Sequence, residues 1–222
     1  MTVLVIGASG FLGGAIAIRY AKEGYTVYGS YKNNPIVPSG CIPVSIDDIY
    51  NIKDKFDIVI LAAGNYSLDK KTLVEINVGL TQNISNRFPD SKLIYISSVS
   101  VYGKHQDTIK EHSFYQDPTF YGQAKLAGET IISTHQKYSI IRLTYLYGVN
   151  MPDNSFLPRI IKSALIDHKI TLYGDGERKQ DYLHIEDAAN LCYLARLGDN
   201  GIFLGVSGVC YSNKEDYKIL QG

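Results

Sequence analysis

Tyr121 and Lys125 are the residues whose types and spacing most directly suggest chemistry. They stand four positions apart in the stretch YGQAKLAGE, at the expected start of a helix. That spacing puts both side chains on one helical face. A free tyrosine, with a pKa of about 10, is a poor base at neutral pH, and a nearby ammonium lowers that pKa by favouring the phenolate. The pair therefore predicts proton transfer, against the alternative of two unrelated surface side chains.

A pair of serines follows an apolar segment upstream. Ser97 and Ser98 come directly after the expected strand Lys92–Ile96. The carboxyl ends of parallel strands line the ligand crevice of an open α/β sheet. A serine hydroxyl there can hydrogen-bond a substrate oxygen as that oxygen gains or loses charge.

Three glycines, Gly7, Gly10 and Gly13, separate the first apolar segment from an amphipathic one in VLVIGASGFLGGAIAIRYA. Glycine lets a backbone turn tightly and approach a phosphate without a Cβ in the way. The helix that follows offers unpaired N–H groups and a positive dipole end, which suit a pyrophosphate. This arrangement predicts dinucleotide binding rather than a plain strand–helix turn.

The end of the second expected strand bears on the choice of cofactor. No carboxylate lies between Thr26 and Asn34, where an acidic residue would bind the ribose 2′-hydroxyl of NAD. Ser30, Tyr31 and Lys32 stand there instead. If Lys32 faces a 2′-phosphate, the cofactor is NADP, which is slightly favoured over NAD. The alternative that stays open is that Lys32 is a solvated surface lysine.

Apolar segments of strand length alternate with amphipathic segments of helix length. The pattern predicts an α/β fold with a doubly wound parallel sheet. The expected strands are Val3–Ile6, Thr26–Gly29, Ile42–Val44, Ile58–Ala62, Lys92–Ile96 and Ser139–Leu143. The expected helices are Phe11–Glu23, Lys71–Asn86 and Tyr121–Gln136.

This rhythm changes after Gly148. We expect a helix at Phe156–Ile166, a short strand at Ile170–Tyr173, a turn-rich loop YGDGERKQD, a helix at Glu186–Leu197 and a strand at Gly201–Leu204. A last helix is expected near Asn213, with Ser212 as its cap. Residues 1–148 are predicted to be the main, dinucleotide-binding domain. Residues 149–222 are predicted to be a small substrate lobe, parts of which pack on the main domain.

Composition excludes several classes of protein. The 222 residues carry 22 basic and 22 acidic side chains, which gives no electrostatic basis for binding nucleic acid or an anionic membrane. Three widely separated cysteines fit a reduced, cytoplasmic chain and predict no metal site. The glycine-interrupted N-terminus is expected to be a strand, a turn and a helix rather than a signal peptide.

Six motifs in order give the chain its resemblance to a known family. They are GASGFLG, INVGLTQN at Ile76–Asn83, SSVSVYG at Ser97–Gly103, PTFYGQAKLAGE at Pro118–Glu129, IRLTYLYG at Ile141–Gly148 and YGDGERKQDYLHIEDAA at Tyr173–Ala189. Together they resemble the extended short-chain dehydrogenase/reductase superfamily, the Rossmann-fold nucleotide-sugar epimerases, dehydratases and 4-keto-sugar reductases. The resemblance covers nearly the whole chain.

The resemblance assigns roles to individual residues. It implies that Tyr121 is the catalytic acid/base, Lys125 its partner and Ser98 the catalytic serine, with Ser97 structural. It implies substrate contacts from Ser98, Tyr145 and Arg178. The residues predicted to bind NAD(P) are Gly7, Ser9, Gly10, Phe11, Leu12, Gly13, Tyr31, Lys32, Ala62, Ala63, Asn77, Tyr121 and Lys125.

Departures from the family pattern narrow the activity. Dehydratases of this branch carry an Asp–Glu pair where this chain has Val99 and Ser100, which argues against dehydration. Many members have asparagine at the position of Tyr145. An aromatic residue there resembles some 4-keto-sugar reductases. Gln180 stands where an arginine usually precedes the Asp–aromatic pair. Family members usually continue further, so the lobe is reduced, the chain is a fragment, or a partner completes it.

The sequence thus predicts an NAD(P)-dependent epimerase or 4-keto reductase acting on a nucleotide sugar. The alternative is a dinucleotide-binding sensor or scaffold that keeps the fold without turnover. We expect the protein to bind a nucleotide-sugar substrate and to bind neither nucleic acid nor a membrane. Whether it forms a homodimer is left open.

Overall fold

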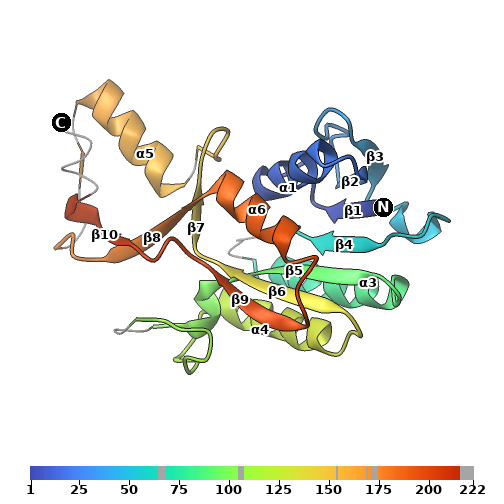
Figure 1. Ribbon diagram of the computed structural model, residues 1–222. Coiled ribbons are helices and arrows are strands. Elements are labelled where there is room, and N and C mark those ends of the chain that lie inside the picture. Colours follow the sequence, from blue (N-terminus) through green and yellow to red (C-terminus); the bar gives the residue numbers. More distant parts are fainter. Residues whose placement is uncertain (65–68, 105–107, 154, 169, 172–174, 216–222) are drawn as a thin grey trace.

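The fold was examined in a computed structural model that describes residues 1–64, 69–104, 108–153, 155–168, 170–171 and 175–215. Its central sheet has seven strands in the order β3-β2-β1-β4-β5-β6-β9, and all its neighbouring pairs are parallel (Figure 1). The strands are β1 (Thr2–Ile6), β2 (Thr26–Tyr31), β3 (Ile42–Ser45), β4 (Ile58–Leu61), β5 (Lys92–Ser98), β6 (Tyr138–Leu143) and β9 (Gly201–Gly205). The predicted parallel Rossmann sheet is confirmed.

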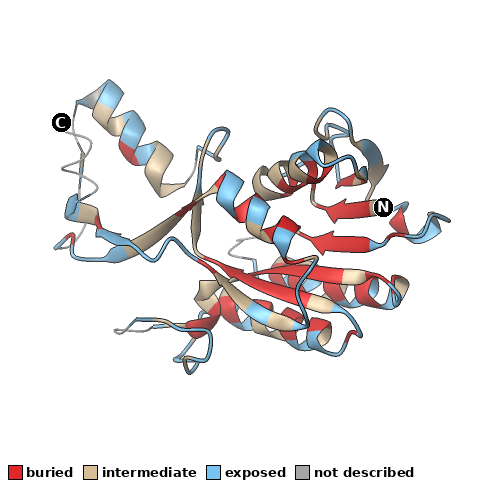
Figure 2. Ribbon diagram, in the orientation of Figure 1, coloured by how far each residue is buried: buried red, intermediate tan, exposed pale blue. Residues whose placement is uncertain are grey.

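Helices cover both faces of this sheet because alternate strand residues point in opposite directions. Val3 and Val5 face one core, which α1 and α6 cover, and Leu4 and Ile6 face the other. The strands of the sheet's centre are buried along most of their length (Figure 2). The helices are α1 (Phe11–Lys22), α2 (Lys70–Val74), α3 (Thr81–Arg87), α4 (Phe120–Ser133), α5 (Phe156–Lys162) and α6 (Ile185–Leu194).

Four shorter helical segments complete the description. Ile49–Asn51 (η1) and Val99–Tyr102 (η3) are 3-10 turns, and Glu75–Leu80 (η2) and Ser163–Asp167 (η4) are π-helical. The single helix expected at Lys71–Asn86 is therefore α2, η2 and α3 in succession. In the same way, the helix expected at Phe156–Ile166 is α5 followed by η4.

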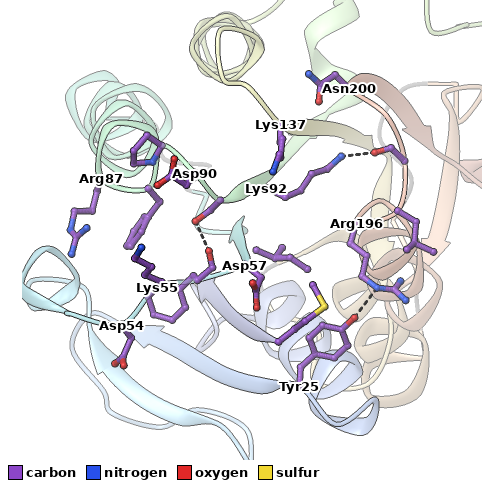
Figure 3. Close-up of a pocket in the computed structure, with 18 of the residues that line it drawn as sticks. Tyr25, Asp54, Lys55, Asp57, Arg87, Asp90, Lys92, Lys137, Arg196 and Asn200 are labelled. Atoms are coloured by element: carbon purple, nitrogen blue, oxygen red, sulfur yellow. Dashed lines mark hydrogen bonds between the residues drawn. The ribbon is translucent and has the colours of Figure 1, made fainter.

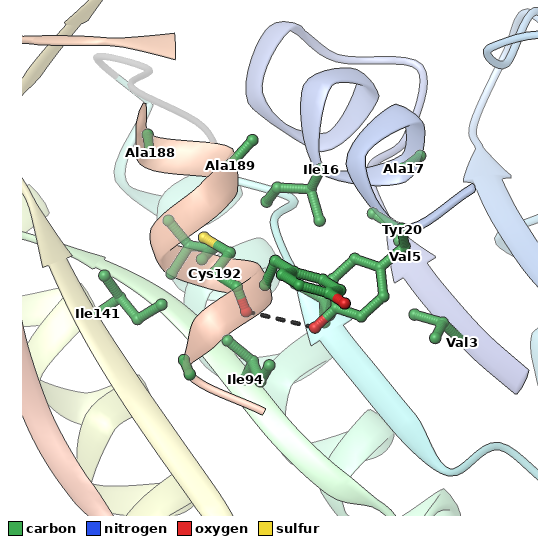
Figure 4. Close-up of a cluster of buried hydrophobic side chains, with 14 of the residues drawn as sticks. Val3, Val5, Ile16, Ala17, Tyr20, Ile94, Ile141, Ala188, Ala189 and Cys192 are labelled. Atoms are coloured by element: carbon green, nitrogen blue, oxygen red, sulfur yellow. Dashed lines mark hydrogen bonds between the residues drawn. The ribbon is translucent and has the colours of Figure 1, made fainter. Parts of the chain in front are cut away.

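The cluster between α1 and α6 joins distant parts of the sequence. Tyr20 of α1 is fully buried, and its hydroxyl donates to the carbonyl of Cys192 in α6 at 3.3 Å (Figure 4). Tyr20 also packs edge-on against Tyr193. Because β9 pairs with β6, both α6 and β9 belong to the body that carries the glycine loop. The division at residue 148 stays a prediction, which allowed for such packing.

A second sheet, missed from the sequence, extends from the first. Its order is β10-β8-β7, formed by β7 (Tyr145–Tyr147), β8 (Lys179–His184) and β10 (Cys210–Ser212). The expected loop YGDGERKQD is wrong from Lys179 onward, where β8 begins. The strand expected at Ile170–Tyr173 lies mostly outside the described residues, and Ile170 and Thr171 are irregular.

Candidate active site

The glycine loop joins β1 to α1 in a conformation that its glycines require. Gly7 has a φ of +90°, and a Cβ there would lie 2.8 Å from the backbone nitrogen of Ala63. A Cβ on Gly13 would lie 2.1 Å from the carbonyl oxygen of Gly7. Gly10 has more space, since the nearest atom to its Cβ position is that oxygen at 3.2 Å.

Ser30 holds this loop from the neighbouring strand. Its buried hydroxyl accepts a hydrogen bond from the backbone N–H of Gly7 at 2.8 Å, and its carbonyl accepts one from Ser9 at 3.4 Å. The sequence argument noticed Ser30 only as the place where a carboxylate is absent. Because Ser30 lies near the carboxyl end of β2, next to β1, the strand-end rule used for Ser98 points to it as well.

The start of α1 is open to an anion. Its N-cap, Gly10, makes no side-chain cap bond, and the first turn holds no acidic residue. The first N–H groups of a helix lack intrahelical partners and favour negative charge. Together with the space beside Gly10, this fits the pyrophosphate of a dinucleotide.

Lys125 is buried, with 3% of its surface exposed. Its Nζ donates to the carbonyl of Ile96 in β5 at 2.9 Å and lies 6.0 Å from the centre of the Tyr121 ring. Burial lowers the pKa of Lys125 from its ordinary 10.5 to about 8, and the carboxylate of Glu129 acts in the opposite direction. The side chain is therefore an ammonium at neutral pH, close to the pH at which it loses its proton.

The N-terminus of α4 places Tyr121 at the cavity. Thr119 caps the helix, its hydroxyl accepting from the N–H of Gly122 at 3.3 Å. A Cβ on Gly122 would lie 2.3 Å from the carbonyl oxygen of Ser100, so this glycine lets α4 approach the turn after β5. The sequence pattern thus sets Tyr121 beside the end of the strand that carries Ser98.

The two serines at the end of β5 do different things. Ser98 Oγ accepts from the N–H of Ser100 at 3.1 Å and donates to the Ser100 hydroxyl at the same distance. Ser97 is buried, and its hydroxyl donates to Glu129 Oε1 at 2.5 Å. Both serines border the cavity, but Ser97 is committed to α4, which supports its reading as structural.

A cavity of about 420 Å³ brings these groups together at the carboxyl ends of the strands. Of the predicted residues, it is lined by Gly7, Gly10, Phe11, Leu12, Gly13, Ala62, Ser98, Tyr121 and Lys125. Its other lining residues are Gly64, Ile96, Ser97, Leu143, Thr144 and Leu146. Leu143 ends β6, Thr144 follows it and Leu146 lies in β7, so the strand-end rule already applied to β5 points to this part of the chain as well.

Other predicted residues do not line this cavity: Ser9, Tyr31, Lys32, Ala63, Asn77, Tyr145 and Arg178. Ala63 packs under Gly7. Asn77 is buried in η2, where its Nδ2 donates to the carbonyl of Leu73 at 3.0 Å and its Oδ1 has no partner among the described residues. Lys32 and Arg178 are exposed.

Tyr145 is occupied within the small lobe. Its hydroxyl accepts from the N–H of Phe156, the first residue of α5, at 2.8 Å, and its ring packs edge-on against Tyr182 of β8. Its structural partners are therefore α5 and β8.

A larger hollow, of about 1460 Å³, opens at the amino ends of β4, β5 and β6 (Figure 3). Two of its cations already serve the fold: Lys92 Nζ donates to the carbonyl of Gly198 at 2.6 Å, and Arg196 Nε donates to the hydroxyl of Tyr25 at 3.0 Å. This hollow lies at the opposite edge of the sheet from the glycine loop, so we assign the chemistry to the smaller cavity.

Comparison with known proteins agrees with this geometry. The model of the NAD dependent epimerase/dehydratase family matches residues 3–201. The chain belongs to this family. That range includes the glycine loop, Ser98, Tyr121 and Lys125, together with most of the small lobe.

Individual members of the family are similar at low identity. An uncharacterized UDP-glucose epimerase of Bacillus subtilis is 28% identical over 99 residues, which cover 42% of this chain and 31% of that protein's length. A UDP-N-acetyl-alpha-D-glucosaminuronate decarboxylase of Bacillus cytotoxicus is 25% identical over 221 residues, covering 83% of this chain and 68% of that protein.

Solved structures of the family share the fold. The UDP-glucose 4-epimerase of Thermotoga maritima with UDP-glucose superposes with a TM-score of 0.89 at 20% identity, covering all of this chain and 82% of the other. That epimerase structure thus has the same overall fold as this chain.

Two further observations concern the described residues as a whole. Within them, no helix combines the length and apolar character that crossing a bilayer requires. Nor do three or more histidine, cysteine, aspartate or glutamate side chains gather there in a way that could hold a metal ion.

Proposed function

We propose that the protein catalyses NAD(P)-dependent oxidation or reduction at a carbon of a nucleotide-activated sugar, as an epimerase or a 4-keto-sugar reductase. The observation that carries the proposal is the single cavity shared by the glycine loop, Ser98, Tyr121 and Lys125. A protein that only binds a dinucleotide does not need all of the last three. The nicotinamide, when bound, supplies the site that accepts or gives the hydride.

Tyr121 is assigned to the proton of the sugar hydroxyl. As a phenolate it removes this proton when the carbon is oxidised, and as a phenol it returns the proton when the carbonyl is reduced. Lys125, an ammonium on the same helical face, favours the phenolate over the phenol. Its remaining N–H groups would hold the ribose of the cofactor.

Ser98 is assigned to the oxygen on which charge develops. Its hydroxyl, now directed to Ser100, can turn toward a sugar oxygen while the N–H of Ser100 still holds it. A hydrogen-bond donor in a site that excludes water stabilises developing charge more strongly than a donor in water.

The substitutions beside Ser98 favour redox chemistry without dehydration. Val99 and Ser100 belong to η3 and offer no carboxylate for the extra proton transfers of dehydration. The family includes members named as epimerases, dehydratases and a decarboxylase, so family membership does not choose among these reactions. We propose UDP- or dTDP-linked hexoses as the substrate class, from the names of those relatives. Arg178 and Tyr145 stay predictions for substrate binding.

Product analysis tests the proposal. The purified protein is incubated with NAD or NADP together with UDP-glucose, UDP-glucuronic acid or dTDP-glucose, and separately with NADPH and a 4-keto nucleotide sugar. The small molecules are identified before and after by mass and by NMR, which distinguishes epimers of equal mass. Cofactor that stays bound and an isomerised sugar indicate an epimerase, whereas NADPH-dependent loss of a keto sugar indicates a reductase. Dinucleotide binding without conversion of any nucleotide sugar would instead support a sensor.

A further inference from the structure

Arg142 on β6 is the largest fully buried side chain described, with 1% of its surface exposed. It takes no part in the chemistry proposed above. A guanidinium has five N–H donors in one plane, and all five are engaged. Two go to Glu129: Nε to Oε1 at 2.9 Å and one terminal nitrogen to Oε2 at 2.6 Å.

The other three donors reach the segment that connects Ser98 to Tyr121. One terminal nitrogen donates to the hydroxyl of Tyr102 at 2.7 Å and to the carbonyl of Glu111 at 3.4 Å. The second donates to the hydroxyl of Tyr115 at 2.7 Å. Tyr102 itself donates to the carbonyl of Glu111 at 3.0 Å, which closes the network.

Glu129 connects the same arginine to the catalytic helix and strand. It lies one turn after Lys125 on α4 and accepts from Ser97, the neighbour of Ser98. Ser97 and Arg142 face each other in the pairing of β5 with β6. One side chain thus joins both sheet strands, α4 and the intervening segment.

Stability alone is a weak reason for such a group. Replacing a buried ion pair by apolar residues is often neutral or stabilising. The planar hydrogen bonds of a guanidinium instead fix the relative positions of the groups that accept them. A lysine has three donors in a different geometry and would leave several of these acceptors unpaired.

We propose that Arg142 is a positioning residue that fixes the separation of the Ser98 and Tyr121 hydroxyls by holding the chain segments that carry them. The proposal rests on the function proposed above, because it is those two hydroxyls that must act on one sugar carbon. A displacement of about 1 Å in such a site costs about a hundredfold in rate.

The test removes the two hydroxyls on the connecting segment while leaving Arg142 and Glu129 paired. The double variant Tyr102→Phe/Tyr115→Phe is compared with Tyr20→Phe, which removes a buried hydroxyl bonded between α1 and α6. If the double variant does not fold, the single variant Tyr115→Phe takes its place, since its ring is 51% exposed. Unfolding midpoints, the Kd for NAD, and kcat and KM for the fastest of the three nucleotide sugars are measured.

We expect the double variant to lose about a hundredfold in kcat, with the Kd for NAD and the KM within about twofold of wild type. Tyr115→Phe alone should lose less, and Tyr20→Phe should keep its kcat. A folded double variant with wild-type kcat, or one whose NAD affinity falls as much as its kcat, would overturn the positioning role.

A second measurement does not depend on turnover. The crystal structure of the double variant with NAD gives the distance from Ser98 Oγ to Tyr121 Oη, which we expect to change by about 1 Å or more. If the wild type binds NAD but converts no nucleotide sugar, the proposed function fails, and this distance alone decides the proposal: an unchanged distance overturns it.

Discussion

At the scale of the residue, the site depends on a lysine held in an unfavourable place. Lys125 is almost fully buried, and its charge is stabilised by the Ile96 carbonyl and by Glu129 one turn away. Burying an ammonium costs free energy that packing elsewhere must offset. Such a cost is typical of functional sites, where perturbed pKa values concentrate.

Replacing Tyr121 by phenylalanine tests the proton-transfer role. The ring still packs, but the proton carrier is gone, and general acid–base groups typically contribute ~10²–10⁴-fold to rate. We expect turnover of the nucleotide sugar to fall by that factor while the Kd for NAD stays within about twofold. Tyr28→Phe, which removes an exposed hydroxyl on β2, is the matched control. A loss smaller than about tenfold would remove Tyr121 from the role.

Replacing Lys125 by methionine separates function from stability. Because the folded-state pKa of about 8 lies below the ordinary 10.5, the unfolded chain binds more protons between these values. Wild-type stability should therefore rise with pH across that window, and the full penalty, of the order of 3 kcal/mol, should apply below pH 8. Lys125→Met removes this penalty together with turnover and part of the cofactor affinity.

The measurement is the unfolding free energy of wild type and Lys125→Met in denaturant at neutral and at alkaline pH. The variant's stability relative to wild type should be highest at neutral pH and should decline as pH rises above 8. Lys71→Met, at a residue whose side chain is 84% exposed, should show no such trend. If the difference in unfolding free energy between Lys125→Met and wild type did not change with pH, the pKa of Lys125 would not be lowered by folding.

Lys32 provides the test of cofactor choice. A charge-assisted contact to a 2′-phosphate is worth roughly 1.5–3 kcal/mol, or about ten- to a hundredfold in affinity. Titration should show tighter binding of NADP than NAD to wild type, and Lys32→Ala should remove most of that difference while barely changing NAD binding. Equal wild-type affinities would return Lys32 to the solvated surface and favour NAD.

At the scale of the element, β1, the glycine loop and α1 form one phosphate-binding unit whose glycines have different tasks. Gly13 lets α1 pack on the loop, where a Cβ would lie 2.1 Å from the Gly7 carbonyl. Gly10 borders the cavity and is less closely approached than Gly13, since a Cβ there would lie 3.2 Å from the Gly7 carbonyl oxygen. Gly7 supplies the positive φ of the turn.

Two matched alanine variants distinguish these tasks. Gly13→Ala should lower the unfolding free energy by about 1–3 kcal/mol, as forced overpacking does. Gly10→Ala should keep nearly the wild-type unfolding midpoint and lose about tenfold or more in dinucleotide affinity. If Gly10→Ala binds the cofactor normally, the loop is only a turn between strand and helix.

Local pattern predicted some elements better than others. The buried strands β1, β4 and β5 were found because near-continuous apolar residues are distinctive of parallel strands covered on both faces. The sequence KQDYLH of β8 is polar, and β7 and β10 have three residues each, so their existence depends on non-local pairing. The spacing of apolar residues does not predict the π-helical segment η2, in which Asn77 lies.

At the scale of the whole molecule, the strand-end rule explains why the site was largely predictable. Residues far apart in sequence converge because parallel strands end at one edge, and nine of the predicted residues line one cavity there. The rule was not carried to β6, which is why Leu143, Thr144 and Leu146 were missed. Ser30 could have been found by the same rule, whereas the hydrogen bonds that Arg142 makes are revealed only by the three-dimensional structure.

The measurement that bears most directly on the central claim is hydride transfer within the protein. Wild-type protein loaded with NAD or NADP is mixed with each nucleotide sugar, and the near-ultraviolet absorbance of the reduced cofactor is followed, with Tyr121→Phe under the same conditions. We predict that at least one sugar, or its keto form with reduced cofactor, changes this absorbance in the wild type, and that the variant is slower by ~10²-fold or more. Unchanged absorbance with every sugar and no isomerised product, in a protein that binds the dinucleotide, or equal rates in the variant, would contradict the account.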